Sequence, residues 1–474
     1  MYEKKMIRTK ELGKNTLIIT IGRISTQFIT FLLLPLYTAV LSTEEYGSVD
    51  LVTTIVQLLV PIVSIMIDQG VFRYLLTCQK ESQKKSIISN AFFILFFLNL
   101  CFLLLYIFLI PVNKLQYKVW ILLILTITTF SNLFLQISRG LKKTIEYTVG
   151  SFICSFITII LNVLCIAFIK MGAVGMLIST FIGNLFCCLF IFVKLRIYRY
   201  ISIFSISKIV IIEEIKYSMP LVPNQLSIWV MNSSDRLVVA YYVGAAANGV
   251  LAVSHKFPTV FMTLFNIFLL AWHETGAVHY FDEDRDSFFT KTIEQIITIF
   301  STICVGMIVV LPIIFDWFIN KSFSEAYYNI PIYLIASLFN VIVGLLGVVY
   351  VATKKTFEIA KTTMISAAIN IIVNIVLIPY IGLYAASLST FVGYLVAMIY
   401  RIIDTRKYLC IKYNIKKYLI LLLGIITSTI IYYINKKIIT ILFIPFYAIY
   451  AIWLNRDFIC LIKNCLIKRK EKYE

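Results

Sequence analysis

The sequence KKTIE at residues 142–146 recurs as KKTFE at residues 354–358, and this repeat decides how the rest of the chain is interpreted. Asn162 and Asn374 follow the two segments at the same spacing, and STFIG at 179–183 matches STFVG at 389–393 with a small slip. Ordered matches of this kind indicate an internal duplication. Repeats that run the same way through a membrane are related by an axis along the membrane normal, with a transport site at their interface.

The composition is that of a membrane protein. Of 474 residues, 60% are hydrophobic and 14% are charged, and the mean hydropathy is +0.90. A soluble domain has about 45–50% apolar and about 25% charged residues. Such a chain can bury its apolar surface only in lipid, because a soluble fold keeps a polar exterior.

Apolar runs long enough to cross a bilayer, about 20 residues each, recur along the chain. They predict an all-α polytopic protein of about fourteen transmembrane helices, with an N-terminal six-helix lobe (1–200), a cytoplasmic linker (201–217), a C-terminal six-helix lobe (218–405), and two extra helices with a basic tail (406–474). The spans are expected near 15–41, 47–67, 87–110, 119–138, 149–169, 173–193, 218–243, 249–272, 293–315, 330–352, 362–381, 383–403, 418–434 and 438–454.

The basic residues indicate the orientation. The net charge is +19, and most Lys and Arg residues fall in loops on the same side as the N-terminus. Cytoplasmic loops are enriched in Lys and Arg, so both termini are predicted to be cytoplasmic. This distribution accounts for the charge without a nucleic-acid partner.

No metal or disulfide framework is expected. Most of the ten cysteines lie within apolar runs, and none has the spacing of a zinc site. We interpret them as small apolar residues and expect neither a metal nor a cofactor.

Polar side chains recur at helical spacing in the first, second, seventh and eighth spans. Polar groups within lipid are costly and usually face a cavity or a partner. These four helices are therefore expected to line a hydrophilic cavity, with these residues on its wall: Thr16, Thr20, Gln27, Thr30, Asp50, Gln57, Gln225, Asn232, Asp235 and Asn266.

Three cations lie within these spans: Arg23, Arg236 and Lys256. A cation near a helix centre costs roughly 2.5–3.5 kcal/mol on insertion, so each must be solvated, paired or useful. One interpretation is a cationic site for a diphosphate, since guanidinium groups bind phosphate bidentately. The other is pairing, for example of Asp235 with Lys256, with Arg23 extending to the inner surface.

Pro220 and Pro223 flank the start of the seventh span. Proline removes a backbone donor and starts or kinks a helix. The two prolines are therefore a candidate hinge.

Several motifs carry a family resemblance. They are LPLY at 34–37 with LSTEEYG at 41–47, YSMPLVPN at 217–224 with NSSDR at 232–236, AANGVLAV at 246–253, AWHE at 271–274 and ATKKT at 352–356. Their order resembles that of the polysaccharide biosynthesis transporters, the Wzx-like oligosaccharide flippases of the multidrug/oligosaccharidyl-lipid/polysaccharide exporter superfamily.

The resemblance implies two six-helix lobes around a cationic cavity. It implies alternating access in the bacterial cytoplasmic membrane and an undecaprenyl-diphosphate-linked oligosaccharide as substrate, for O-antigen, capsule or exopolysaccharide assembly. It also implies that the unit passes to a polymerase and chain-length proteins, that Arg23 contacts substrate, and that the two extra helices shelter the lipid tail.

Three alternatives remain open. A multidrug/cation antiporter of the same fold would be expected to carry a carboxylate in its first helix, and this chain has Arg23 there. A peptidoglycan-precursor (lipid II) flippase shares the fold. A membrane glycosyltransferase or polymerase needs catalytic acids in sizeable loops, which this chain lacks, so an enzyme with catalytic residues is not expected.

Overall fold

The computed structural model describes residues 30–109 and 117–460 of the 474, and the described part is helical throughout with no β-strand. Twelve of its helices are long and apolar enough to span a bilayer. Thr30–Val40 is an apolar helix that is shorter than these spans. Within the seventh expected span, 218–243, a helix of 22 residues covers Leu221–Tyr242 and is about 33 Å long, but it is not among the twelve. The prediction of an all-α polytopic fold is confirmed.

Contacts divide the chain into two compact units, Met1–Gly249 and Val250–Glu474. The first contains α2 (Leu34–Val40), α3 (Thr43–Ser64), α4 (Ile67–Thr77), α5 (Glu81–Leu109), α6 (Lys118–Gly140), α7 (Thr144–Val163), η2 (Leu164–Phe168), α8 (Gly172–Lys194), η3 (Ile197–Arg199), η4 (Ile203–Ser205), α9 (Lys208–Ser218), α10 (Leu221–Tyr242) and the start of α11 (Ala245–His279). The division into six-helix lobes at 201–217 stays a prediction.

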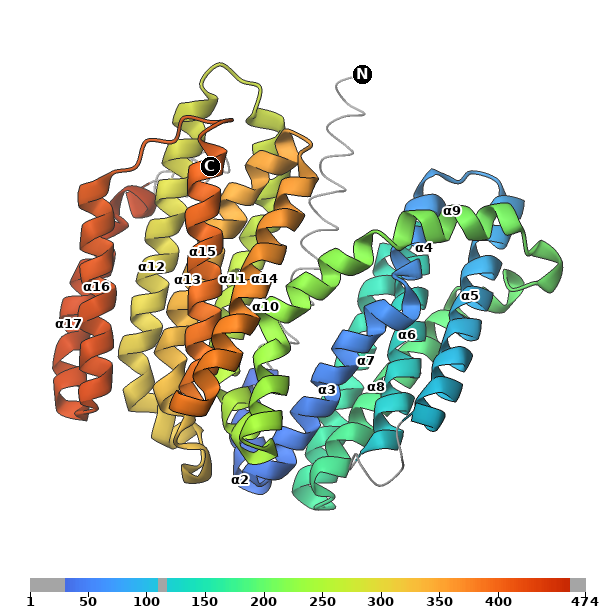
Figure 1. Ribbon diagram of the computed structural model, residues 1–474, viewed down its shortest axis with the longest axis horizontal. Helices are drawn as coiled ribbons and strands as arrows, with labels where there is room; N and C mark the ends of the chain where they lie inside the picture. The colour runs from blue at the N-terminus through green and yellow to red at the C-terminus, as the bar shows by residue number, and fades with distance from the viewer. Residues whose placement is uncertain (1–29, 110–116, 461–474) are drawn as a thin grey trace, which may run out of the picture. The chain divides into compact units, whose positions relative to one another are not determined.

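The second unit contains the rest of α11, followed by α12 (Arg285–Phe318), η5 (Lys321–Phe323), α13 (Ala326–Ala352), α14 (Thr356–Ile381), α15 (Tyr384–Thr405), α16 (Ile415–Ile434) and α17 (Lys437–Leu454). Within it, α15 packs against α13 and α14, while the two extra helices α16 and α17 pack as a pair on α12 (Figure 1).

The duplication seen in the sequence is also present in the backbone. Lys142 and Lys354 both adopt the left-handed conformation, with φ of 62° and 59°. In both turns the next residue donates its amide to a carbonyl five positions back, from Lys143 to Ser138 and from Lys355 to Tyr350, each at 2.8 Å. Equal sequences therefore form equal helix ends, as in a Schellman turn.

The start of α3 shows how local sequence fixes a helix. The Ser42 hydroxyl accepts from the Glu45 amide at 3.1 Å, and the Glu45 carboxylate accepts from the Ser42 amide at 3.0 Å. This reciprocal capping box satisfies two donors that a helix start leaves open. Ser42 and Glu45 thus place the first residue of α3 at Thr43.

The second span ends earlier than its hydropathy suggests. The sequence predicts helix over 47–67, whereas α3 ends at Ser64, and Ile65 and Met66 have φ of 49° and 56°. Positive φ is unusual for bulky and β-branched residues. The break separates α3 from α4, and apolar composition alone gives no signal for it.

The predicted linker 201–217 is ordered and largely helical. It includes η4 and most of α9, and α9 lies across the ends of α4 and α5 (Figure 1). This segment is therefore part of the first unit and packs on α4 and α5.

Candidate functional site

The charged contact at the centre of the candidate site joins α3 to α10. Arg236 Nη1 donates to Asp50 Oδ1 at 3.0 Å, and these two side chains are only 16% and 12% exposed. Asn248 Nδ2 donates to Asp50 Oδ2 at 3.3 Å and to the Gly47 carbonyl at 2.9 Å. Both carboxylate oxygens of Asp50 are thus engaged.

Packing between α3 and α10 positions this pair. Trp229, two turns before Arg236, donates its indole N–H to the carbonyl of Thr54 at 3.2 Å, and Thr54 lies one turn after Asp50. The two contacts are in opposite order along the two helices, so α3 and α10 are antiparallel. A buried indole usually has a hydrogen-bond partner, and here that partner fixes the register.

Two glycines allow a close backbone approach beside the pair. A Cβ added at Gly47 would collide with the carbonyl oxygen of Ala245, and one added at Gly249 would collide with the carbonyl oxygen of Thr43. Only glycine fits where two backbones touch. The contact holds Asn248 against α3, within reach of Asp50.

The pair neutralises a cation inside an apolar helix bundle. An Arg at a helix centre costs roughly 2.5–3.5 kcal/mol on insertion, and an adjacent carboxylate offsets this cost. Removing one member of such a pair leaves an uncompensated charge. Asp50 therefore compensates the charge of Arg236 as long as the two side chains remain together.

The structure places the other predicted site residues as follows. Thr16, Thr20, Arg23 and Gln27 lie outside the described residues, and Thr30 is the first described one. Among the rest, Gln57, Asn232 and Asn266 are exposed, Gln225 and Lys256 are half-buried, and Asp235 is buried.

Asp235 is adjacent to the pair and is buried. Its Oδ1 accepts the Arg236 backbone amide at 2.9 Å. The pairing of Asp235 with Lys256 stays a prediction, whereas the contact of Asp50 with Arg236 was not predicted from the sequence. Asp50 and Arg236 are 186 residues apart, so no local spacing reveals the contact. Asn248 was also missed as a polar partner.

The candidate hinge lies at a real helix boundary. Pro220 caps α10 and Pro223 lies in its first turn, while α9 ends at Ser218. The rings are tolerated because the first helical residues need no intrahelical donor. Hinge motion itself stays a prediction.

A second buried arginine, in α15 of the second unit, was not singled out from the sequence. Arg401 is 5% exposed. Its Nη1 donates to the Val343 carbonyl at 2.7 Å, and its Nε and Nη2 donate to Thr362 Oγ1 at 3.2 and 3.0 Å. Arg401 lies near the end of a predicted span, where a cation is expected to reach water.

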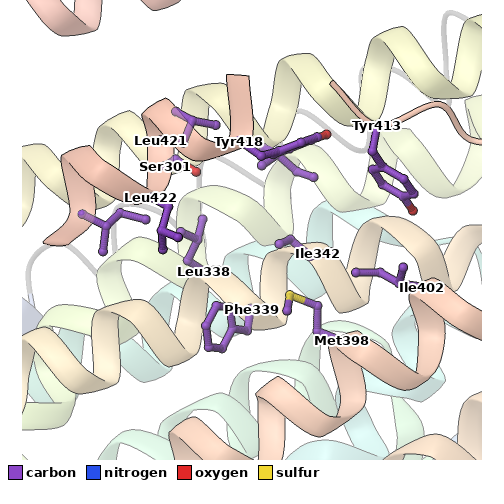
Figure 2. A pocket seen from close by; sticks show the side chains of 12 residues that line it. Ser301, Leu338, Phe339, Ile342, Met398, Ile402, Tyr413, Tyr418, Leu421 and Leu422 are labelled. Atoms are coloured by element: carbon purple, nitrogen blue, oxygen red, sulfur yellow. The ribbon is translucent and has the colours of Figure 1, made fainter. Parts of the chain in front are cut away.

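The second unit also contains an apolar cavity of about 320 Å³. Figure 2 shows Leu338 and Phe339 of α13, Met398 of α15 and Leu421 of α16 around it. The lining residues are Ile297, Ser301, Leu338, Phe339, Ile342, Met398, Ile402, Tyr413, Tyr418, Leu421, Leu422 and Ile425. Such a lining suits hydrocarbon better than a charged or sugar group.

Several solved structures share this fold. Lipid II flippase MurJ in an inward closed conformation has a TM-score of 0.69 and 17% identity, over 94% of this chain and all of that chain. An inward-facing multidrug resistance MATE family transporter of the MOP superfamily has a TM-score of 0.68 and 14% identity, over 82% and 97%. A MOP superfamily transporter from Pyrococcus furiosus, described as having a binding pocket of reverse polarity, has a TM-score of 0.57 and 16% identity, over 83% and 94%.

The sequence comparisons give the family. No curated protein matches the chain by sequence. Residues 12–272, more than half of the chain, match the family described as polysaccharide biosynthesis protein. This match includes α3, α10 and the Asp50–Arg236 pair. The chain is therefore a multi-pass membrane protein that belongs to the polysaccharide biosynthesis protein family and has the fold of the MOP superfamily transporters.

Proposed function

We propose that this chain is a flippase that moves a polyprenyl-diphosphate-linked oligosaccharide, of the undecaprenyl type, from the cytoplasmic to the outer face of the bacterial cytoplasmic membrane by alternating access. The observation that carries the proposal is the family match over residues 12–272, which includes the buried charge pair. Both termini are proposed to be cytoplasmic, and a polymerase and chain-length proteins of a surface polysaccharide pathway are the proposed partners.

In this proposal Arg236 binds the diphosphate by exchanging anions. Its guanidinium has five N–H donors, and Asp50 Oδ1 contacts it through Nη1. Phosphate oxygens are acceptors that guanidinium groups bind bidentately. Exchange of the Asp50 carboxylate for phosphate keeps the buried cation compensated at every stage. Arg23 and Lys256 are proposed to add positive charge to the same site.

The lipid tail requires an apolar environment. The cavity between α12, α13, α15 and α16 is lined almost wholly by aliphatic and aromatic side chains (Figure 2). We assign part of the polyprenyl chain to it, which gives α16, the first of the two extra helices, a role in transport.

The test is Arg236→Gln in a strain whose surface polysaccharide depends on this chain. We expect surface polymer to fall by about tenfold or more, and lipid-linked oligosaccharide to accumulate on the cytoplasmic face, with normal amounts of protein in the membrane. Lys417→Gln is the matched control, because it breaks the Lys417–Glu294 pair, which has the same 3.0 Å separation but lies in the second unit. Equal polymer output from both variants would refute the proposed site.

A lipid II flippase is the second candidate, favoured by the 94% coverage of this chain in the MurJ comparison. Purified protein in vesicles distinguishes it, because lipid II and a lipid-linked oligosaccharide carry different sugars on the same diphosphate. Transport of lipid II but not of the oligosaccharide would replace the first proposal. Transport of a cationic drug with neither lipid would favour an antiporter.

A further inference from the structure

Helix α9 is docked tightly on α4. A Cβ added at Gly70 of α4 would collide with the Ser218 hydroxyl of α9 and would lie 3.3 Å from the Glu214 carbonyl oxygen. The Tyr74 hydroxyl donates to the Glu213 carbonyl at 3.1 Å. The glycine permits the approach and the tyrosine fixes its register.

Glu214 lies inside the contact between α9 and α4, which is called the seam below. Its exposed fraction is 0%, and neither of its carboxyl oxygens has a hydrogen-bond partner among the residues that the structure describes. An ionised carboxylate in such a place is very costly unless it is paired, and the usual outcome is that the group is neutral. The geometry by itself therefore requires a bound proton while α9 is docked.

The charged groups around Glu214 also favour its protonated form. Glu213, next along α9, is the acid whose charge acts on Glu214, and on α4 the titratable group at the seam is Tyr74, beside the exposed Arg73. On the α5 side Glu81 is held by Lys84 at 2.6 Å. Burial, followed by repulsion from Glu213, raises the pKa of Glu214 from its ordinary value of 4.5 to about 9.

A cavity of about 490 Å³ with a mixed polar and apolar lining adjoins the contact between α9 and α4. Its lining is rich in hydroxyl groups and includes both glutamates. The lining residues are Tyr74, Thr77, Cys78, Ser82, Gln83, Ser86, Ile87, Ser207, Val210, Glu213 and Glu214. A cavity of this size can hold water, so solvent lies close to Glu214 when α9 undocks.

We propose that Glu214 is a proton-binding site, and that α9 docks on α4 only while the Glu214 carboxyl carries its proton. Undocking exposes the carboxyl to water, where it ionises and releases the proton. Because α9 leads directly into α10, which carries Arg236, loss of the proton would free the start of that helix. The inference does not depend on which substrate the chain carries.

The sign of the pH dependence follows from the two states. The docked state keeps the proton up to about pH 9, and the undocked state loses it near the ordinary value of 4.5. Docking is therefore at full strength below pH 4.5 and weakens as the pH rises from there to about 9. One proton is released on undocking, so the undocking constant rises about tenfold per pH unit within this window.

Hydrogen exchange of the full chain in lipid nanodiscs, followed by mass spectrometry from pH 5 to pH 8, tests the proposal. After correction for intrinsic exchange, we expect the opening constant of peptides covering α9 to rise about tenfold per pH unit. Peptides from α8 in the same sample should show no such rise. A flat α9 response in the unmodified chain would overturn the proposal without any variant.

Two substitutions sharpen the test. Glu214→Gln should abolish the pH dependence of α9 opening. If the Glu214→Gln variant does not fold, Glu214→Met serves for the same measurement. Glu213→Gln is the matched control and should keep the tenfold slope, because the titrating carboxyl is still present. A slope that survives in both Glu214 variants, or that disappears in Glu213→Gln, would show that Glu214 is not the proton site.

Discussion

Arg236 in the first unit is half-buried and Arg401 in the second is buried, and the two are held by different chemistry. Arg236 contacts a carboxylate, Asp50, across two antiparallel helices. Arg401 donates to the Thr362 hydroxyl and the Val343 carbonyl, and these acceptors are neutral. Asp404, one turn further along α15, is engaged by Tyr350 at 2.8 Å and by Lys407 at 2.7 Å.

The difference separates an exchangeable cation from a fixed one. A carboxylate partner can be replaced by another anion, so a pair such as Asp50–Arg236 suits a site that binds and releases a charged ligand. Neutral acceptors on α13 and α14 tie Arg401 to two other helices and leave no anion to exchange. Arg401 is therefore a structural link within the second unit.

The largest effect is expected from Asp50→Asn. This change leaves the Arg236 guanidinium without the carboxylate that contacts it, and breaking a buried pair typically costs 3–5 kcal/mol. We expect about 3 kcal/mol, because the two side chains retain some exposure. Denaturant unfolding in detergent measures it, and a double-mutant cycle with Arg236→Gln should give strong coupling. Additive single effects would contradict a functional pair.

Thr362→Val should have the second largest effect, a loss of about 2 kcal/mol in the free energy of unfolding. The change removes the acceptor of two Arg401 donors that are buried, and an unsatisfied buried donor costs about 1–3 kcal/mol. The neighbouring Thr363→Val is the control, since the Thr363 hydroxyl bonds only to the Ile359 carbonyl of its own helix. Equal unfolding free energies for the two variants would show that Thr362 does not hold Arg401.

Arg401→Met should lower the free energy of unfolding by about 1 kcal/mol, which is less than the loss for Thr362→Val, although the change removes the charge of Arg401. The Thr362 hydroxyl keeps its own bond to the Ile359 carbonyl at 2.9 Å, so no buried donor is left open. Replacing a buried ion by an apolar side chain of similar volume is often nearly neutral. In the double variant the cost of Thr362→Val should largely disappear. If Arg401→Met lowered the free energy of unfolding by more than Asp50→Asn does, the proposed difference between the two arginines would be wrong.

Lys437→Gln gives the smallest effect and sets the baseline. It breaks the Lys437–Asp316 pair at 2.8 Å, whose side chains are 55% and 69% exposed. Exposed pairs contribute about 0.2–1 kcal/mol and are weakened by salt. We expect a change near the lower value that vanishes in high salt. An effect as large as that of Asp50→Asn would mean that ion pairs in this protein cannot be ranked by burial.

The sequence predicted helix positions well because apolar length is a local property. It also indicated the duplication, and the structure shows that KKTIE and KKTFE begin in equivalent turns. It could not predict the Asp50–Arg236 contact, which joins residues on helices far apart in the chain. Glu214 was hidden for a related reason: a charged residue in a basic linker is typical of a solvated segment, and only the docking of α9 on α4 buries it.

The paired turns at Lys142 and Lys354 have a further consequence for engineering. They differ only in Ile145 and Phe357, which are 66% and 75% exposed, so the two segments are interchangeable parts. A label introduced at one turn can also be introduced at the equivalent position of the other turn, which has the same backbone geometry. The repeated sequence thus supplies an internal reference, because the same label can report on one turn in each unit.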